Sequence, residues 1–226
     1  MKAKIGKTYL TEIPHKGGEL TFQYPAFRGY FGEVAEALEK EGLKKPTSSE
    51  TASLVYDAFQ NKEGKYELEI ISILNNTWFW EFTGNLYLPK SNEEVNNGVL
   101  LNLKPRIENG KLIMNKNDLI KRLRGKDPDI KFVPFGYKTG EQTVPELMKN
   151  PYIVARYDGE GAQKIAEIAS EYKKAPKLWS FDSVDKEEVR MSALFGCWGF
   201  GDRLDLGGDW YGGNLGHAFG VCTPEK

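Results

Sequence analysis

The spacing of apolar residues changes several times along this chain, and the order of those changes is the feature that most limits its fold. Apolar residues recur every three or four positions in 31–38 and again in 54–59, which predicts two helices in the first quarter. Gly42 suits the end of the first helix. Thr47 and Glu50 have the spacing of a capping box, so the second helix should begin there.

The middle third has the character of β-strands rather than helices. We expect strands at 66–74, 78–88, 99–103 and 112–114. Asn75 and Asn76 tolerate a positive φ and suit a tight turn between the first two strands. The segment Glu108–Lys111 carries an Asn-Gly pair, which is the strongest hairpin signal in the chain. This part of the sequence therefore predicts an antiparallel meander.

Helices and strands alternate after residue 115. We expect helices at 118–124, 144–149, 162–174 and 185–195, and strands at 130–135, 152–157 and 178–181. Together the segments predict an α+β fold, with a mainly antiparallel mixed sheet, helices packed on one side and a glycine-rich C-terminal segment. We expect residues 1–226 to form a single domain and leave open a sub-boundary near residue 115.

The segment Trp78–Phe82 alternates in the manner of a strand. Trp78, Trp80 and Phe82 should share one face, and Phe79 and Glu81 the other. The aromatic face could pack in the core or meet a partner, and the core is the favoured interpretation.

The character of the sequence changes from Gly196 onward. Glycines are dense up to Gly220, and aromatic and acidic side chains lie between them. Loops of this length in a compact domain are often functional. The aromatic residues argue against disorder, because disordered segments lack them.

We expect this C-terminal segment to bind a small polar or ring-containing ligand. Glycine lets the backbone approach a ligand, aromatic rings offer stacking faces, and carboxylates accept hydrogen bonds from hydroxyl groups. The candidate residues are Asp202, Asp205, Asp209, Trp210, Tyr211, Asn214 and His217. The alternative is an irregular structural cap whose aromatic residues fill the core and whose aspartates cap turns.

Neither a metal nor a cofactor is predicted from these residues. Asp202, Asp205, Asp209 and His217 offer donors that Ca²⁺ or Mg²⁺ could use, but their spacing does not match an EF-hand. An aspartate paired with His217 could serve in general acid–base catalysis. A nucleophile elbow and a P-loop are both missing from the sequence, so whether the chain is an enzyme stays open.

Residues Gly212–Cys222 resemble the glycine-rich loop near the end of the CRISPR repeat-associated RNA-binding proteins. The matching residues are Gly212, Gly213, Gly216, Phe219 and Gly220. The resemblance covers about a twentieth of the chain and implies an RNA-binding module with a ferredoxin-like fold. The segment from 196 onward holds three aspartates against the single Arg203, which disfavours contact with a phosphate backbone.

Charge, cysteine content and the first residues limit the partners, the state of the thiols and the compartment that we expect. The net charge is −1, which makes nucleic acid an unlikely main partner. Cys197 and Cys222 are too few for a disulfide framework, so we expect reduced thiols, with a bridge between them as the alternative. The first ten residues lack the apolar run of a secretion signal, so we expect a cytoplasmic protein that does not enter membranes.

Two further segments could bind anions but have simpler explanations. Asp158–Gly161 lies where a helix N-terminus could meet a phosphate, and we expect a helix cap and tight turn instead. The basic run Lys121–Lys126 should lie in the last turn of a helix, where cations are favoured. His15, the other histidine of the chain, should be a turn residue.

Three functions remain after these arguments. The first is binding of a small ligand by 196–220. The second is a protein-interaction or structural subunit, or a homo-oligomer, that contacts another chain through the aromatic strand or this segment. The third is an RNA-binding module.

Overall fold

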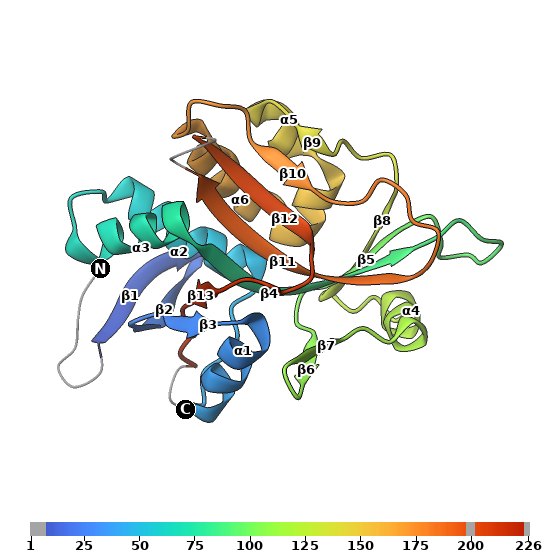
Figure 1. Cartoon of the computed structure of the whole chain (residues 1–226), viewed down its shortest axis with the longest axis horizontal. Coiled ribbons are helices and arrows are strands. Elements are labelled where there is room, and N and C mark those ends of the chain that lie inside the picture. The colour runs from blue at the N-terminus through green and yellow to red at the C-terminus, as the bar shows by residue number, and fades with distance from the viewer. Residues whose placement is uncertain (1–7, 198–201, 224–226) are drawn as a thin grey trace.

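The computed structural model describes residues 8–197 and 202–223 (Figure 1). Four residues of the glycine-rich segment, 198–201, lie outside this description. The helices are α1 (Phe31–Lys40), α2 (Ser48–Gln60), α3 (Lys65–Asn76), α4 (Lys116–Arg124), α5 (Val144–Lys149) and α6 (Pro151–Ser170). The strands are β1 (Thr8–His15), β2 (Gly18–Tyr24), β3 (Phe27–Gly29), β4 (Trp78–Leu88), β5 (Gly98–Asn102), β6 (Arg106–Glu108), β7 (Lys111–Ile113), β8 (Ile130–Pro134), β9 (Gly140–Glu141), β10 (Lys177–Trp179), β11 (Glu188–Cys197), β12 (Arg203–Trp210) and β13 (Gly216–Ala218).

A nine-stranded mixed sheet forms the centre of the fold. Its main path runs β3-β13-β4-β11-β12-β10-β9, and β5 and β8 extend it from β4. Among the described strands, only the β10–β12 and β13–β4 pairs are parallel. The predicted α+β class and mainly antiparallel sheet are confirmed. Strands from both sides of residue 115 pair in this sheet.

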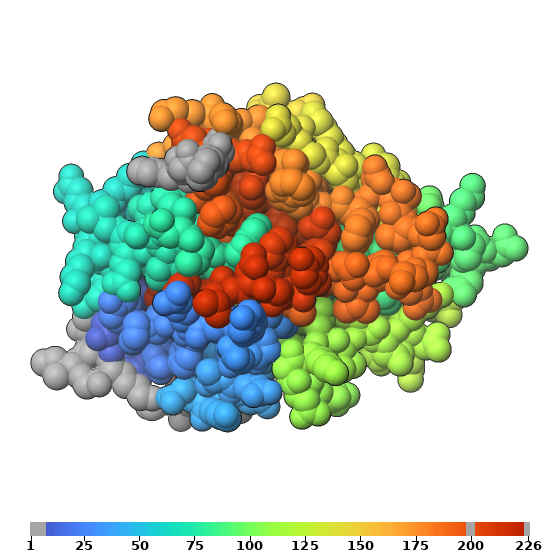
Figure 2. All heavy atoms as spheres, viewed as in Figure 1, coloured from blue at the N-terminus to red at the C-terminus, as the bar shows by residue number. Residues whose placement is uncertain are grey.

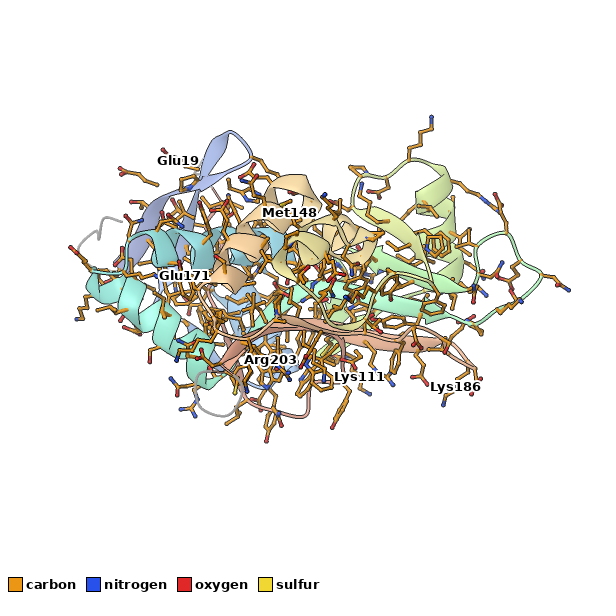
Figure 3. All side chains as sticks on the ribbon, turned by 90° about the horizontal axis from the view of Figure 1, so that it is seen from above. Glu19, Lys111, Met148, Glu171, Lys186 and Arg203 are labelled. Carbon is orange, nitrogen blue, oxygen red and sulfur yellow. The ribbon has the colours of Figure 1, made fainter. Side chains whose placement is uncertain are left out.

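Strand β4 shows why the two faces of the sheet carry different cores. Trp80 and Phe82 pack with α1, whereas Phe79 lies in the main core with residues of α2, α3 and α6. The predicted alternation is therefore confirmed, and Trp80 and Phe82 of the aromatic face are core residues. Figure 3 views the sheet nearly edge-on: Met148 of α5 lies on the helical side and Arg203 of β12 on the other.

A buried ion pair joins α6 to the sheet. Arg156 Nη2 donates to Glu81 Oε2, and both side chains are completely buried. Arg156 Nη1 also donates to the carbonyl oxygen of Gly207 at 2.8 Å, and Nη2 to that of Ala193 at 3.2 Å. Burial alone would lower the pKa of Arg156, and the attraction of Glu81 raises it above its ordinary value. One guanidinium thus binds three adjacent strands.

Several local signals give the predicted structure. Thr47 and Glu50 form the capping box of α2. Asn109 and Gly110 have φ angles of 49° and 70°, as a two-residue turn between β6 and β7 requires. Asp158 Oδ1 accepts a hydrogen bond from Gly161 N at 2.9 Å, so this segment is a helix cap inside α6.

No disulfide joins Cys197 and Cys222. Among the described helices, none is long and apolar enough to cross a membrane.

Two predicted strands are helices. Residues 66–74 belong to α3, and their buried residues Ile70, Ile71 and Leu74 have helical spacing that the isoleucine content obscures. Asn75 and Asn76 end this helix and make no hairpin turn. Residues 152–157 belong to α6, which Asn150 caps through a hydrogen bond to Tyr152 N. The kink at Asp158 separates this first part from the second, where the sequence did predict a helix.

The C-terminal third contains the opposite error. The predicted helix 185–195 is mostly the strand β11, which lies between β4 and β12. Both faces of the sheet are covered here, so Ala193 and Leu194 are buried in succession and show no alternation. The expected glycine-rich loop is largely β12 and β13. Gly216 of β13 is needed because a Cβ there would lie 2.5 Å from Trp80.

Removing the Arg156 guanidinium should destabilise the whole domain. Arg156→Met leaves the Glu81 charge buried without its partner, which should cost about 3–5 kcal/mol. For a domain of this size, the melting temperature should fall by roughly 10 °C in a circular dichroism melt. The double variant Glu81→Leu/Arg156→Met should recover most of that loss. A single variant that melts within about 2 °C of the wild type would contradict this role.

Candidate functional site

The candidate site lies on the face of the sheet opposite α6. Helix α1 covers this face over β4 and β13, and the part formed by β10, β11 and β12 lies beyond it. Figure 2 shows this side of the molecule, with the C-terminal residues in its centre. A pocket of about 260 Å³ opens here, lined by Trp78, Trp179, Phe195, Asp205, Gly207, Asp209, Trp210 and Tyr211.

Strand β12 supplies the floor of this aromatic pocket. Leu204 and Leu206 point into the main core, so the alternate residues Asp205, Gly207 and Asp209 face the pocket. A β-bulge follows, because Ala193 pairs with Gly207 whereas Met191 pairs with Trp210. The extra residue in β12 breaks the alternation, and the consecutive residues from 209 to 211 all line the pocket.

Aromatic rings from separate parts of the chain form the walls. Trp78 lies 4.3 Å from Trp210 and 4.9 Å from Phe195, measured between ring centroids. Tyr211 stacks on Trp210 with centroids 5.8 Å apart. Tyr211 is 74% exposed and Trp179 39% exposed, so both lie at the rim. These contacts hold the rings before any ligand is present.

Two adjacent glycines in β12 have different roles. A Cβ at Gly208 would lie 2.1 Å from Tyr152 Oη, which is buried and bonded to Asn85. A Cβ at Gly207 would meet its nearest neighbour, the carbonyl oxygen of Ala193, at 3.5 Å, which is an ordinary contact. Gly208 is therefore required by the core, whereas packing alone would accept a side chain at Gly207.

The two carboxylates of the pocket differ in their partners. Asp205 accepts a hydrogen bond from Arg203 Nε at 2.8 Å. Asp209 forms no ion pair with any described residue. Burial raises the pKa of Asp205 and of Asp209 above the ordinary value, although Arg203 partly opposes the shift at Asp205. Holding these charges in the pocket costs stability.

The structure separates the candidate residues taken from the sequence. Asp205, Asp209, Trp210 and Tyr211 line one pocket. Two other candidates lie elsewhere. Asp202 pairs with Lys173 at 2.9 Å. His217 Nδ1 lies 2.8 Å from Thr77 Oγ1. Asn214 is exposed and does not line the pocket. Burial and then the nearby Arg28 lower the pKa of His217, whereas an aspartate partner would raise it.

Sequence reasoning missed Trp78, Trp179, Phe195 and Gly207 as pocket residues. Trp78 begins β4, Trp179 ends β10 and Phe195 lies on β11. The aromatic content of Trp78–Phe82 was a usable signal, but it favoured the core. Strand pairing brings these rings to β12, and no local pattern indicates that pairing.

Another hollow is larger, and three of the four lysines that line it are paired with carboxylates. A cleft of about 690 Å³ is lined in part by Lys16, Lys44 and Lys104. Each of these ammonium groups pairs with a carboxylate of the same cleft, namely Asp158, Glu50 and Asp129. Over the described ranges, 8–197 and 202–223, no group of three or more His, Cys, Asp or Glu residues could hold a metal ion.

No family model and no curated protein matches the chain. A solved structure of a protein from Nanoarchaeota does resemble it, with a TM-score of 0.60 and 14% sequence identity. The match covers 88% of this chain and 98% of the nanoarchaeal one, which is described as accommodating massive sequence variation by the C-type lectin fold. At this identity the likeness shows the fold alone. The ferredoxin-like fold implied by residues 212–222 is therefore not the one observed.

Alanine substitutions at Gly207 and Gly208 should distinguish the glycine that the core requires from the glycine that faces the pocket. Gly208→Ala forces its Cβ against Tyr152 and should cost about 1–3 kcal/mol. That corresponds to a melting temperature lowered by roughly 3–10 °C. Gly207→Ala is the matched control and should melt within about 2 °C of the wild type. Equal losses in both variants would contradict the assignment of Gly207 to the pocket floor.

Replacing Asp209 by Asn should stabilise the protein at neutral pH. The raised pKa of Asp209 means that the folded state favours the protonated carboxyl, so ionisation destabilises the fold. The wild type carries this cost at pH 7 and loses it as the pH falls through the folded pKa towards the ordinary value of 3.8. Thermal melts of both proteins from pH 7 to pH 4 should therefore converge at the acid end. A constant difference would exclude ionisation of Asp209 as its cause.

Proposed function

We propose that this protein binds a small ligand, with a ring or a compact apolar group, in the aromatic pocket. The observation that carries the proposal is the convergence of five aromatic side chains and two carboxylates on one pocket of about 260 Å³. Ligand sites are typically apolar hollows with a few placed polar groups. Aromatic rings at such a site provide contact area with little conformational entropy to lose.

The energetic cost of the site supports the same function. Trp179 and Tyr211 leave apolar surface exposed at the rim, and the half-buried carboxylate of Asp209 lacks an ion-pair partner among the described residues. Neither feature stabilises the fold, and unfavourable arrangements of this kind concentrate at functional sites.

Blocking the floor of the pocket tests the proposal. Gly207→Leu should place a side chain in the pocket while the protein stays folded, because a Cβ at Gly207 would make only ordinary contacts, the nearest at 3.5 Å, and faces the pocket. We would screen monosaccharides, nucleosides and small organic cations by thermal shift and tryptophan fluorescence. At least one class should stabilise the wild type and lose about 10-fold or more in affinity with Gly207→Leu, since a filled pocket excludes the ligand.

Gly207→Ala is the control for this screen, because its small side chain leaves most of the pocket open. Binding should persist in that variant. If every compound affects the wild type and Gly207→Leu equally, the pocket is not a ligand site and the proposal fails.

A protein partner is the second candidate, and the exposure of Tyr211 and Trp179 favours it. Such a partner would bury the rim, whereas a small ligand would fill the floor. Substitution of Tyr211 by Ser should therefore weaken a protein complex more than Gly207→Leu does. The RNA-binding alternative draws no support from the pocket, because its two carboxylates would repel phosphate.

A further inference from the structure

We propose that the group bound in the aromatic pocket is an alkylated ammonium cation, such as a trimethylammonium head group. This inference rests on the proposed function and names its ligand class. It follows from the ring faces, from the charge balance around Asp209 and from the size and lining of the pocket.

The rings are the residue types that attract a cation most strongly. Three tryptophans, Trp78, Trp179 and Trp210, line the pocket with Phe195 and Tyr211. The negative face of an aromatic ring attracts a cation, and tryptophan does so best. One ammonium group already lies over a ring at the rim, because Lys177 Nζ is 3.4 Å from the centroid of Trp179.

The charges around the pocket leave one carboxylate unmatched. Arg190 and Arg156 are the cations close enough to affect the pKa of Asp209. Each already has an acidic partner: Arg190 pairs with Glu188 at 2.7 Å, and Arg156 pairs with Glu81. The other carboxylate, that of Asp205, has two cations nearby: Arg203 and Lys177 both act to lower its pKa. A cation in the pocket would therefore supply the positive charge that Asp209 lacks.

The size and chemistry of the pocket favour an alkylated cation over a sugar. Its volume of about 260 Å³ is below the roughly 300–1,000 Å³ of pockets that enclose drug-sized ligands, so it suits a head group. The lining offers a sugar few polar partners, chiefly the carboxylates of Asp205 and Asp209 and the unpaired Nε1 of Trp210, so other hydroxyl groups would be buried unpaired, at a cost for each. A quaternary ammonium has no N–H to satisfy and needs only ring faces and a nearby negative charge.

The experiment compares choline with its uncharged carbon isostere, 3,3-dimethylbutan-1-ol, by isothermal titration calorimetry on the full chain. The two molecules have the same shape, so their difference in affinity reports the charge. Choline should bind the wild type about 10-fold more tightly than the isostere, as desolvated cation–π contacts allow. Asp209→Asn should remove most of this preference, by weakening the binding of choline more than that of the isostere.

Asp185→Asn is the matched control, because Asp185 is exposed and the substitution makes the same change in net charge. It should leave the preference for choline intact. A further pair of titrations, with a trimethyl-lysine peptide and its unmodified form, distinguishes the source of the group. Tighter binding of the modified peptide than of choline indicates a methylated protein, and the reverse order indicates a free small molecule.

The outcomes separate this inference from the function on which it rests. Equal binding of choline and the isostere would overturn the cation and leave an apolar ligand pocket. A preference for choline that survives in Asp209→Asn would overturn the assigned charge balance. Failure of both compounds, with another class of ligand still sensitive to Gly207→Leu, would overturn the inference alone. If no compound at all distinguishes Gly207→Leu from the wild type, the proposed function fails as well.

Discussion

The buried pair of Arg156 and Glu81 is the interaction on which the rest of the fold depends. The guanidinium comes from α6, the carboxylate from β4, and two further bonds reach carbonyl oxygens of β11 and β12. A charge so buried is tolerated only with its partner, and the hydrogen bonds to the two carbonyl oxygens satisfy further donors of the guanidinium. One of the carbonyls belongs to Gly207, so the group that fixes α6 to the sheet also fixes the floor of the pocket.

Strand β12 shows how one short segment serves both core and site. Its inward residues Leu204, Leu206 and Gly208 meet the helices, and Gly208 leaves room for Tyr152. Its outward residues Asp205 and Asp209 carry the polar groups of the pocket. The division follows from the pleat of a strand, which sends successive side chains to opposite faces. The bulge then turns Trp210 towards the same pocket.

Local signals were sufficient for some elements and misleading for others. The capping box of Thr47 and Glu50 and the Asn109-Gly110 turn depend on neighbouring residues only, and the structure contains both. Residues 66–74 and 185–195 were assigned to the wrong class. In α3 the isoleucine content is typical of a strand although the spacing of the buried residues is helical, and in β11 burial on both faces removes the alternation that marks a strand.

By itself, the sequence determined the class of the fold and indicated the segment that supplies most of the residues of the candidate site. The density of glycine, aromatic and acidic residues after Gly196 pointed to Asp205, Asp209, Trp210 and Tyr211, and these four residues share the pocket. Only the tertiary structure added Trp78, Trp179 and Phe195, and only it removed Asp202, Asn214 and His217. The physical reason is that pairing between distant strands decides which residues meet, and the hydrogen bonds of that pairing are made by the backbone, which every sequence shares.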